Sequence, residues 1–199
     1  MGKYTTISAH THIGGGSHLA ILPKIMEISE GPVLELGMGL FSTPYLHWAC
    51  FNEKRKLVSY ENKKQFHEMF IFDDRRELCN NYSAYHDVHF VENSDWDALD
   101  LESTHWGVVL IDHNPGPRRR EEMKRLANKA DYMVVHDTDE KNDFYYKYRE
   151  YFPLFKYRYD TKLYPQTTIL SNFKDLKELQ EYEIENSSGN ATRSPSNNS

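Results

Sequence analysis

Residues 33 to 43 read VLELGMGLFST, which is an apolar strand, a turn with two glycines and the start of a helix. Gly37 permits a tight turn and Gly39 lets a ligand approach the backbone closely. The free N–H groups of the helix that begins near Ser42 favour a negatively charged group. Glu35, just before the turn, would repel a pyrophosphate but would pair well with an amino group. The stretch therefore predicts a ligand site at the end of the first strand.

Strand and helix patterns alternate along the chain. The expected strands cover residues 33–36, 56–61, 87–92, 106–112 and 132–137, and the expected helices cover residues 17–29, 42–51, 63–78, 121–130 and 142–152. Two further strands, 154–161 and 166–172, are separated by too few residues for a crossover and must pair as a hairpin. The order predicts an α/β fold: a doubly wound, mostly parallel Rossmann-like sheet of about seven strands that ends in an antiparallel hairpin, with helices on both faces.

The length of 199 residues suits one buried core. We expect a single domain over residues 1–185, in which the glycine-rich leader, residues 1–17 with His10 and His12, could fold over the ligand as a lid. Residues 186–199 contain no large apolar side chain, and we expect them to be disordered.

The net charge is −6 and the pI is near 5.9, which gives no general attraction to nucleic acid or to an anionic membrane. We therefore expect neither as a partner. No apolar run approaches the roughly 20 residues of a membrane span, and the N-terminus has no signal-like apolar block. On this basis we expect a cytoplasmic protein.

The residues Glu35-Leu36-Gly37-Met38-Gly39 match the pattern E/D-x-G-x-G, and on this motif the chain resembles the class I S-adenosylmethionine-dependent methyltransferases. In that family an acid at the end of the second strand holds the ribose hydroxyls, and a short polar segment after the third strand touches the adenine. Glu61 and residues 94–96 stand at those places. The resemblance covers residues 15–172 and departs at Phe41, where many members carry a third glycine. It implies S-adenosylmethionine as cofactor, bound by Glu35, Gly37, Gly39, Ser42, Thr43, Glu61, Ser94, Asp95, Trp96 and Asp112.

Acids also follow the fourth and fifth expected strands. Asp112 and Asp137 come directly after buried apolar runs, where a carboxylate is unfavourable unless something uses it. The arrangement resembles the catechol-type, small-molecule and sugar O-methyltransferases, in which acids at these two strand ends hold a divalent cation. The resemblance implies Mg²⁺ or Mn²⁺ on Asp112 and Asp137, with Thr138 or Asp139 as third ligand.

The alternative is a metal-free site in which His113 or His136 acts as a base, since imidazole titrates near neutral pH. The candidate catalytic residues are therefore Asp112, His113 and His136. The run Arg118-Arg119-Arg120 is either a solvated helix start or a contact for an acidic or phosphorylated acceptor.

These features predict an S-adenosylmethionine-dependent O-methyltransferase acting on a hydroxyl of a small molecule, sugar or glycan, with or without help from a divalent metal. One alternative is an NAD-dependent oxidoreductase, which is opposed by Ser42, where the G-x-G-x-x-G fingerprint requires glycine, and by the terminal hairpin. The other is a non-catalytic module that binds S-adenosylmethionine. RNA methylation is disfavoured because the chain has no basic appendage.

Overall fold

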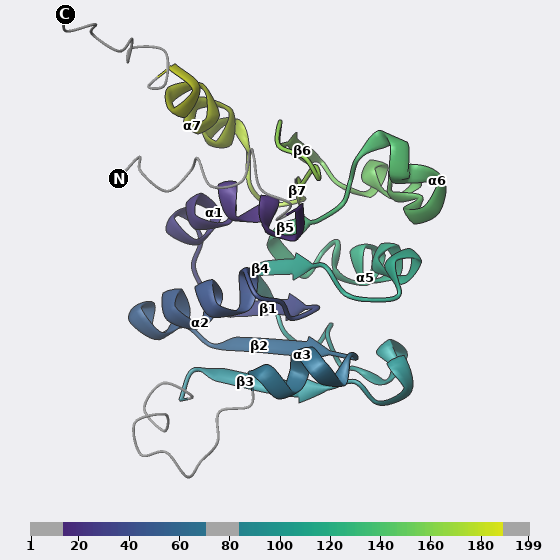
Figure 1. Cartoon of the computed structure of the whole chain (residues 1–199). Helices are drawn as coiled ribbons and strands as arrows, with labels where there is room; N and C mark the ends of the chain where they lie inside the picture. Colours follow the sequence, from purple (N-terminus) through teal and green to yellow (C-terminus); the bar gives the residue numbers. More distant parts are fainter. Residues whose placement is uncertain (1–13, 71–83, 189–199) are drawn as a thin grey trace, which may run out of the picture.

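The computed structural model describes residues 14–70 and 84–188, which form one seven-stranded sheet. Its order is β3-β2-β1-β4-β5-β7-β6 (Figure 1). The strands are β1 (Val33–Leu36), β2 (Leu57–Glu61), β3 (His86–Phe90), β4 (Trp106–Ile111), β5 (Ala130–Val135), β6 (Tyr157–Asp160) and β7 (Thr168–Ser171). The first five are parallel, whereas β7 runs antiparallel to both β5 and β6. The expected fold class, including the closing hairpin, is confirmed.

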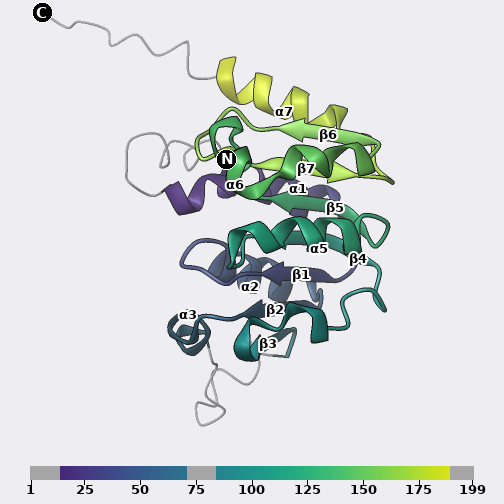
Figure 2. The same cartoon turned by 90° about the vertical axis from the view of Figure 1, so that its right-hand side faces the viewer.

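Helices cover both faces of this sheet (Figures 1 and 2). They are the 3₁₀ helix η1 (Gly14–Ala20) and the α-helices α1 (Leu22–Ile28), α2 (Ser42–Glu53), α3 (Lys64–Met69), α5 (Arg119–Leu126), α6 (Asp143–Tyr146) and α7 (Lys177–Ser188). Short 3₁₀ turns lie at Glu92–Ser94, Trp96–Ala98, Gly116–Arg118, Glu140–Asn142, Tyr148–Glu150 and Phe152–Leu154.

The strands divide their side chains between two hydrophobic clusters, because successive residues of a strand point to opposite faces. Val33 packs in the cluster with α1, α2 and α7, whereas Leu34 and Leu36 pack in the cluster with α5. Glu35 therefore projects toward the same face as Val33, beneath α2. The period of the strand thus places a carboxylate inside the protein.

The segments before β1 and after β5 are more broken than the sequence indicates. The helix expected at residues 17–29 is divided into η1 and α1, with Pro23 in the first turn of α1. The hydroxyl of Ser17, the first residue of this expected helix, bonds to residues after β5 and before β7. The helix expected at 142–152 is interrupted at Lys147, whose φ is 57°.

The outer boundaries also differ. The helix expected at 63–78 ends at Met69, and residues 71–83 lie outside the described residues. Helix α7 runs to Ser188, so residues 186–188 are helical rather than disordered, and residues 189–199 lie outside the described residues. The same holds for residues 1–13 of the expected lid. Within the described ranges, no helix has the length and apolar character needed to cross a bilayer.

Gly107 lies where β4 passes the chain that enters β1. A Cβ atom at this position would lie 1.6 Å from the carbonyl oxygen of Glu30, a backbone atom that cannot move aside without moving the strand. We expect Gly107→Ala to lower the free energy of unfolding by at least about 1–3 kcal/mol, the usual cost of overpacking. Urea denaturation measures this. Gly15→Ala is the matched control, because its Cβ would meet only Phe41 ring carbons at 3.8 Å or more; equal stability of the two variants would contradict the register of β4.

Candidate active site

The site lies at the carboxyl ends of β1, β4 and β5. The sheet order reverses between β1 and β4, and ligands of open α/β sheets bind at such a switch point. Backbone hydrogen bonds fix the register there: the N–H of Asp112 donates to Leu36, and the N–H of His136 donates to Ile111. The glycine turn, Asp112 and His136 consequently share one edge of the sheet, as the sequence predicts.

Glu35 holds the glycine turn in place from inside the protein. Its carboxylate accepts hydrogen bonds from the hydroxyls of Ser42 at 2.6 Å, Thr43 at 2.9 Å and Ser59 at 2.6 Å. The Thr43 hydroxyl in turn accepts the N–H of Gly39 at 2.9 Å. The side chain has no solvent exposure, so it supports the turn and the start of α2 rather than facing a ligand. The expected direct contact between Glu35 and an amino group is therefore not what the structure shows.

Burial without a cationic partner changes the chemistry of Glu35. Burial raises its pKa to about 7, against the opposing effect of the three hydroxyl groups. Behind Ser59 the network continues to His86 at 2.8 Å and from His86 to His47 at 3.0 Å. Because Ser59 gives its proton to the ionised carboxylate, the Nε2–H of His86 must donate to Ser59.

Glu61 holds the other side of the turn. Its carboxylate accepts the N–H of Met38 at 2.8 Å and the N–H of Lys63, and burial raises its pKa. Gly37 has a φ of +97°, and a Cβ there would lie 2.5 Å from the backbone of Asp112. A Cβ on Gly39 would meet nothing within 4 Å in the described chain. The turn is thus packed tightly at Gly37 and open at Gly39, on the side where a ligand would approach.

Ser94 and Asp95 are exposed beyond β3, and the Ser94 hydroxyl accepts a hydrogen bond from Asn62 at 2.7 Å. Trp96 is buried instead. Its ring stacks on His113 with centroids 4.0 Å apart, and its Nε1–H donates to the Asn114 carbonyl. Of the three expected adenine contacts, Ser94 and Asp95 are available at the surface.

His113, expected as a candidate base, lies inside the protein. Its side chain is fully buried, with Nε2 3.0 Å from the equally buried carboxylate of Glu122. Arg118 also contacts Glu122, at 2.9 Å. His113 therefore supports the loop after β4 from within and does not reach the mouth of the site.

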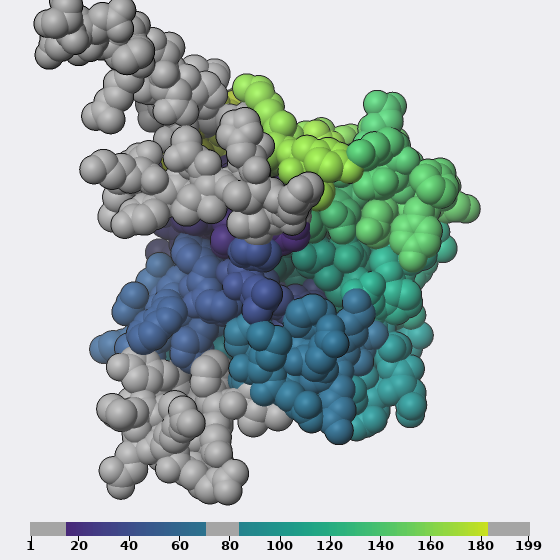
Figure 3. Space-filling view, in the orientation of Figure 1, coloured from purple at the N-terminus to yellow at the C-terminus, as the bar shows by residue number. Residues whose placement is uncertain are grey.

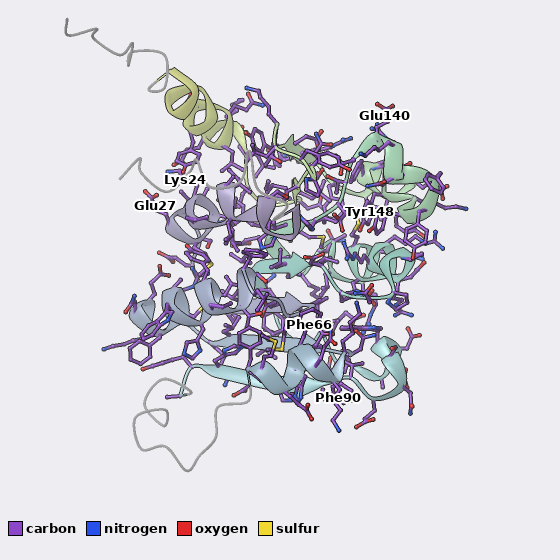
Figure 4. All side chains as sticks on the ribbon, in the orientation of Figure 1. Lys24, Glu27, Phe66, Phe90, Glu140 and Tyr148 are labelled. Atoms are coloured by element: carbon purple, nitrogen blue, oxygen red, sulfur yellow. The ribbon has the colours of Figure 1, made fainter. Side chains whose placement is uncertain are left out.

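Arg119 joins the two strand-end acids. Its guanidinium lies 2.9 Å from Asp112 and 3.1 Å from Asp137, with only 5% of its side chain exposed. The Tyr146 hydroxyl donates to Asp137 at 3.2 Å, and the guanidinium lies over the Tyr146 ring. Arg119 is therefore an internal partner of the acids and neither a solvated helix residue nor a free anion contact. Tyr148, labelled in Figure 4, packs behind them and donates to the carbonyl of His136 at 3.4 Å.

Charges around His136 shift its titration. Burial disfavours the imidazolium, but Asp112 and Asp137 outweigh burial and raise the pKa of His136 to about 9. Burial would raise the pKa of both acids as well, but Arg119 and His136 hold the pKa of each below its usual range. At neutral pH the carboxylates are ionised and His136 carries a proton when no other cation is bound, so a base role for its imidazole is disfavoured.

The expected oxygen-ligand metal site on Asp112, Asp137 and Thr138 does not fit a divalent cation. Arg119 lies between Asp112 and Asp137, so the two carboxylates are not available together as ligands of one ion. The Thr138 hydroxyl donates to the Gln166 carbonyl at 3.1 Å and accepts from Thr168 at 2.8 Å, which fixes it away from the acids.

Sequence reasoning missed two further residues. Ser17 and His18, from η1, lie against His136: the Ser17 hydroxyl is 2.8 Å from His136 Nε2, and the two imidazole rings meet edge to face. In Figure 3 the purple surface of this N-terminal segment adjoins the blue surface of α2. Burial, with the nearby His136, lowers the pKa of His18 to about 4. The only sequence signal was the pair Ser17-His18 directly after the glycine run.

Searches with protein-family models and among curated proteins found no match to the chain. Solved structures are similar in fold. The O-methyltransferase TomG from Streptomyces achromogenes, solved with S-adenosylmethionine, is 19% identical, with 77% of this chain and 78% of that chain covered and a TM-score of 0.53. Human methyltransferase 10 domain containing protein is 12% identical, with 79% and 81% covered and a TM-score of 0.50. The chain therefore has the fold of the class I S-adenosylmethionine-dependent methyltransferases.

The expectation that excludes nucleic acid as a partner and allows only a small-molecule or carbohydrate acceptor is wrong in that exclusion, because neither the net charge nor the fold fixes the acceptor class. A putative tRNA (m1A22) methyltransferase from Streptococcus pneumoniae is among the similar structures, with 13% identity, 82% of this chain and 86% of that chain covered and a TM-score of 0.49. So is an RNA methyltransferase from Salinibacter ruber. A net charge of −6 averages over a whole surface, whereas recognition is local, so it does not restrict the acceptor class.

Glu35 gives the site a measurable pH dependence. Its folded pKa of about 7 lies above the ordinary value of 4.5, so folding takes up a proton between these values and stability falls as pH rises from about 4.5 to 7. We expect Glu35→Gln to remove this loss, which is at most about 3 kcal/mol. Urea denaturation across this pH range measures the difference. Glu92→Gln, an exposed control, should keep the wild-type profile; an unchanged profile in Glu35→Gln would contradict the assignment.

Proposed function

We propose that the chain is an S-adenosylmethionine-dependent methyltransferase that methylates a hydroxyl oxygen. The observation that carries the proposal is the glycine turn at the switch point between β1 and β4, clamped by Glu35 and Glu61 and open above Gly39 beside Asp112. The likeness to class I methyltransferases supports the same ligand class.

The donor set fits the cofactor. The backbone at Gly39 leaves room for close approach. Glu61 ends β2, where its carboxylate would accept hydrogen bonds from ribose hydroxyls in addition to those from the backbone. Ser94 and Asp95 stand beyond the neighbouring strand β3, where they would contact the adenine. Asp112 is a partly exposed, ionised carboxylate at the mouth of the site, next to the turn. When bound, S-adenosylmethionine would supply an electrophilic methyl group on a sulfonium.

The polar groups around Asp112 and His136 suit a hydroxylated acceptor. The carboxylate of Asp112 can accept a hydrogen bond from an acceptor hydroxyl and orient its oxygen. When the acceptor oxygen takes up the methyl group, its hydroxyl proton would pass to this carboxylate or to water. Arg119 keeps Asp112 ionised and fixes its rotamer. No step uses a metal on Asp112, Asp137 and Thr138.

Two measurements separate this proposal from its competitors. Isothermal calorimetry should show that S-adenosylhomocysteine binds and NADH does not; the reverse would favour the oxidoreductase. A methyl-donor assay against sugars, phenols, glycans and RNA should then show turnover on at least one class. Binding of S-adenosylhomocysteine without turnover on any of them would favour a non-catalytic module.

Gly39 allows binding to be tested separately from folding. A Cβ at this position would enter the open space above the turn without touching the described chain. We expect Gly39→Ala to keep the wild-type melting temperature while it weakens S-adenosylhomocysteine binding at least about tenfold, a loss of about 1.4 kcal/mol. Calorimetry and thermal denaturation measure the two quantities. Unchanged affinity would place the cofactor elsewhere.

A variant of Asp112 tests the methyl-transfer step separately from folding. If its carboxylate orients the acceptor hydroxyl and takes up its proton, Asp112→Asn should lower kcat about 100-fold or more. The amide keeps the shape of the side chain and Asp137 still pairs with Arg119, so the variant should still fold, which thermal denaturation checks. Asp87→Asn, at the opposite end of the strands, is the control. If both variants turn over at the wild-type rate, Asp112 has no part in the reaction.

A further inference from the structure

Three potential metal ligands from separate parts of the chain meet beside the site. They are His18 of η1, Asp112 after β4 and His136 after β5, and one ligand atom from each lies within 4.8 Å of the other two. Both histidines are almost fully buried, and Asp112 is partly buried. In the described part of the chain, this is the one set of three such side chains close enough to share an ion.

His18 is unusual because its polar atoms are unused. Both ring nitrogens are buried, and neither finds a hydrogen-bond partner within the described residues. A buried imidazole without partners is unfavourable, and buried polar side chains nearly always have at least one. The ring meets His136 edge to face, with centroids 5.1 Å apart. Within the described residues, His18 therefore has no hydrogen-bond partner that would offset the unfavourable burial of its ring nitrogens.

His136 is oriented with one nitrogen toward the same point. The Ser17 hydroxyl donates its single proton to the carbonyl of Pro165 at 2.6 Å, so it can only accept from His136 Nε2–H at 2.8 Å. Nδ1 then faces Asp112 and Asp137, 3.4 Å from an oxygen of each, a separation too long for a good charge-assisted hydrogen bond. Ser17 thus fixes the ring as an outer hydrogen bond fixes a metal-binding histidine.

We propose that His18, Asp112 and His136 bind a divalent first-row transition ion such as Zn²⁺, Co²⁺ or Mn²⁺. Two imidazoles and one carboxylate suit these ions, whereas Mg²⁺ prefers oxygen ligands and water. Metal–ligand bonds of about 2.0–2.2 Å require the three atoms to lie within about 4.4 Å of one another, so binding draws the side chains slightly together. The remaining positions stay open to water or a ligand.

The ligand set is compatible with Arg119. Asp112 Oδ1 lies 2.9 Å from Arg119 and 3.4 Å from His136 Nδ1. A carboxylate oxygen has two lone pairs, so Oδ1 can accept from Arg119 through one and bind a metal through the other, and Oδ2 is a further possible ligand atom. Asp137 keeps its contacts with Arg119 and Tyr146. In this set the ion replaces the proton on His136 Nδ1 and gives His18 a partner. The inference does not rest on the proposed methyl transfer, because the three ligands are present in the chain whether or not it binds a cofactor.

The test uses the full chain, stripped with EDTA and titrated with Zn²⁺ by calorimetry and with Co²⁺ by visible absorption. We expect about one ion per chain and no comparable binding of Mg²⁺. Loss of an outer hydrogen bond to a metal ligand typically weakens metal binding 10–100-fold, so loss of the ligand in His18→Gln or His136→Gln should weaken it at least tenfold. His105→Gln, a half-exposed histidine at the other end of β4, should bind like the wild type.

Two controls keep the result decisive. His10 and His12 could bind metal by themselves, so a double variant with His10→Ala and His12→Ala should retain the wild-type affinity. Zn²⁺ should raise the melting temperature of the wild type but not that of His18→Gln. A cooperative melting transition in His18→Gln would show that the variant still folds. Asp112→Asn gives the same comparison if His18→Gln does not fold. The proposed site would be wrong if the chain bound no stoichiometric Zn²⁺ or Co²⁺, or if the ligand variants kept wild-type affinity. It would also be wrong if only the His10→Ala, His12→Ala double variant lost binding.

Discussion

The hydrogen bonds to the buried carboxylate of Glu35 hold the functional end of the molecule together. Ser42 and Thr43, at the start of α2, and Ser59 of β2 donate hydrogen bonds to it. The Thr43 hydroxyl also accepts the N–H of Gly39, which ties the turn to the same carboxylate. Burying a carboxylate is unfavourable unless its oxygens are satisfied, and here hydroxyl groups satisfy them without a cation. The turn is therefore positioned by a polar contact inside the protein, which leaves its outer surface free for a ligand.

A second constraint acts at the ends of β4 and β5. Asp112 and Asp137 would repel each other without a cation between them, and Arg119 supplies it from the start of α5. His136 adds a second positive charge at neutral pH when no ion is bound. The two halves of the site thus use different chemistry. Neutral hydroxyls hold the glycine turn, whereas balanced charges hold the region proposed for the acceptor.

The alternation of strand and helix patterns was sufficient to predict the sheet, because apolar strands at these spacings have few other ways to bury their side chains. The same alternation, applied within β1, would have placed Glu35 on the same face of the sheet as Val33, and both faces of this strand are buried. The roles of Arg119 and His18 could not be predicted in this way. Arg119 reads as part of a charged run, and His18 reaches the site from a leader segment whose docking depends on tertiary contacts. Ser17 has the side chain of a helix cap, but its hydroxyl satisfies a distant carbonyl instead.

The contacts of Ser17 have a consequence for the order in which the protein is assembled. The hydroxyl that orients His136 also bonds to Pro165, so one of the first described residues is joined to the loop between the last two strands. Contacts between such distant parts of a chain form late, because the intervening segment must first be ordered. On the ribosome, the leader would have to wait for the closing hairpin to emerge. A nascent chain would therefore carry a formed glycine turn before the neighbouring polar centre is complete.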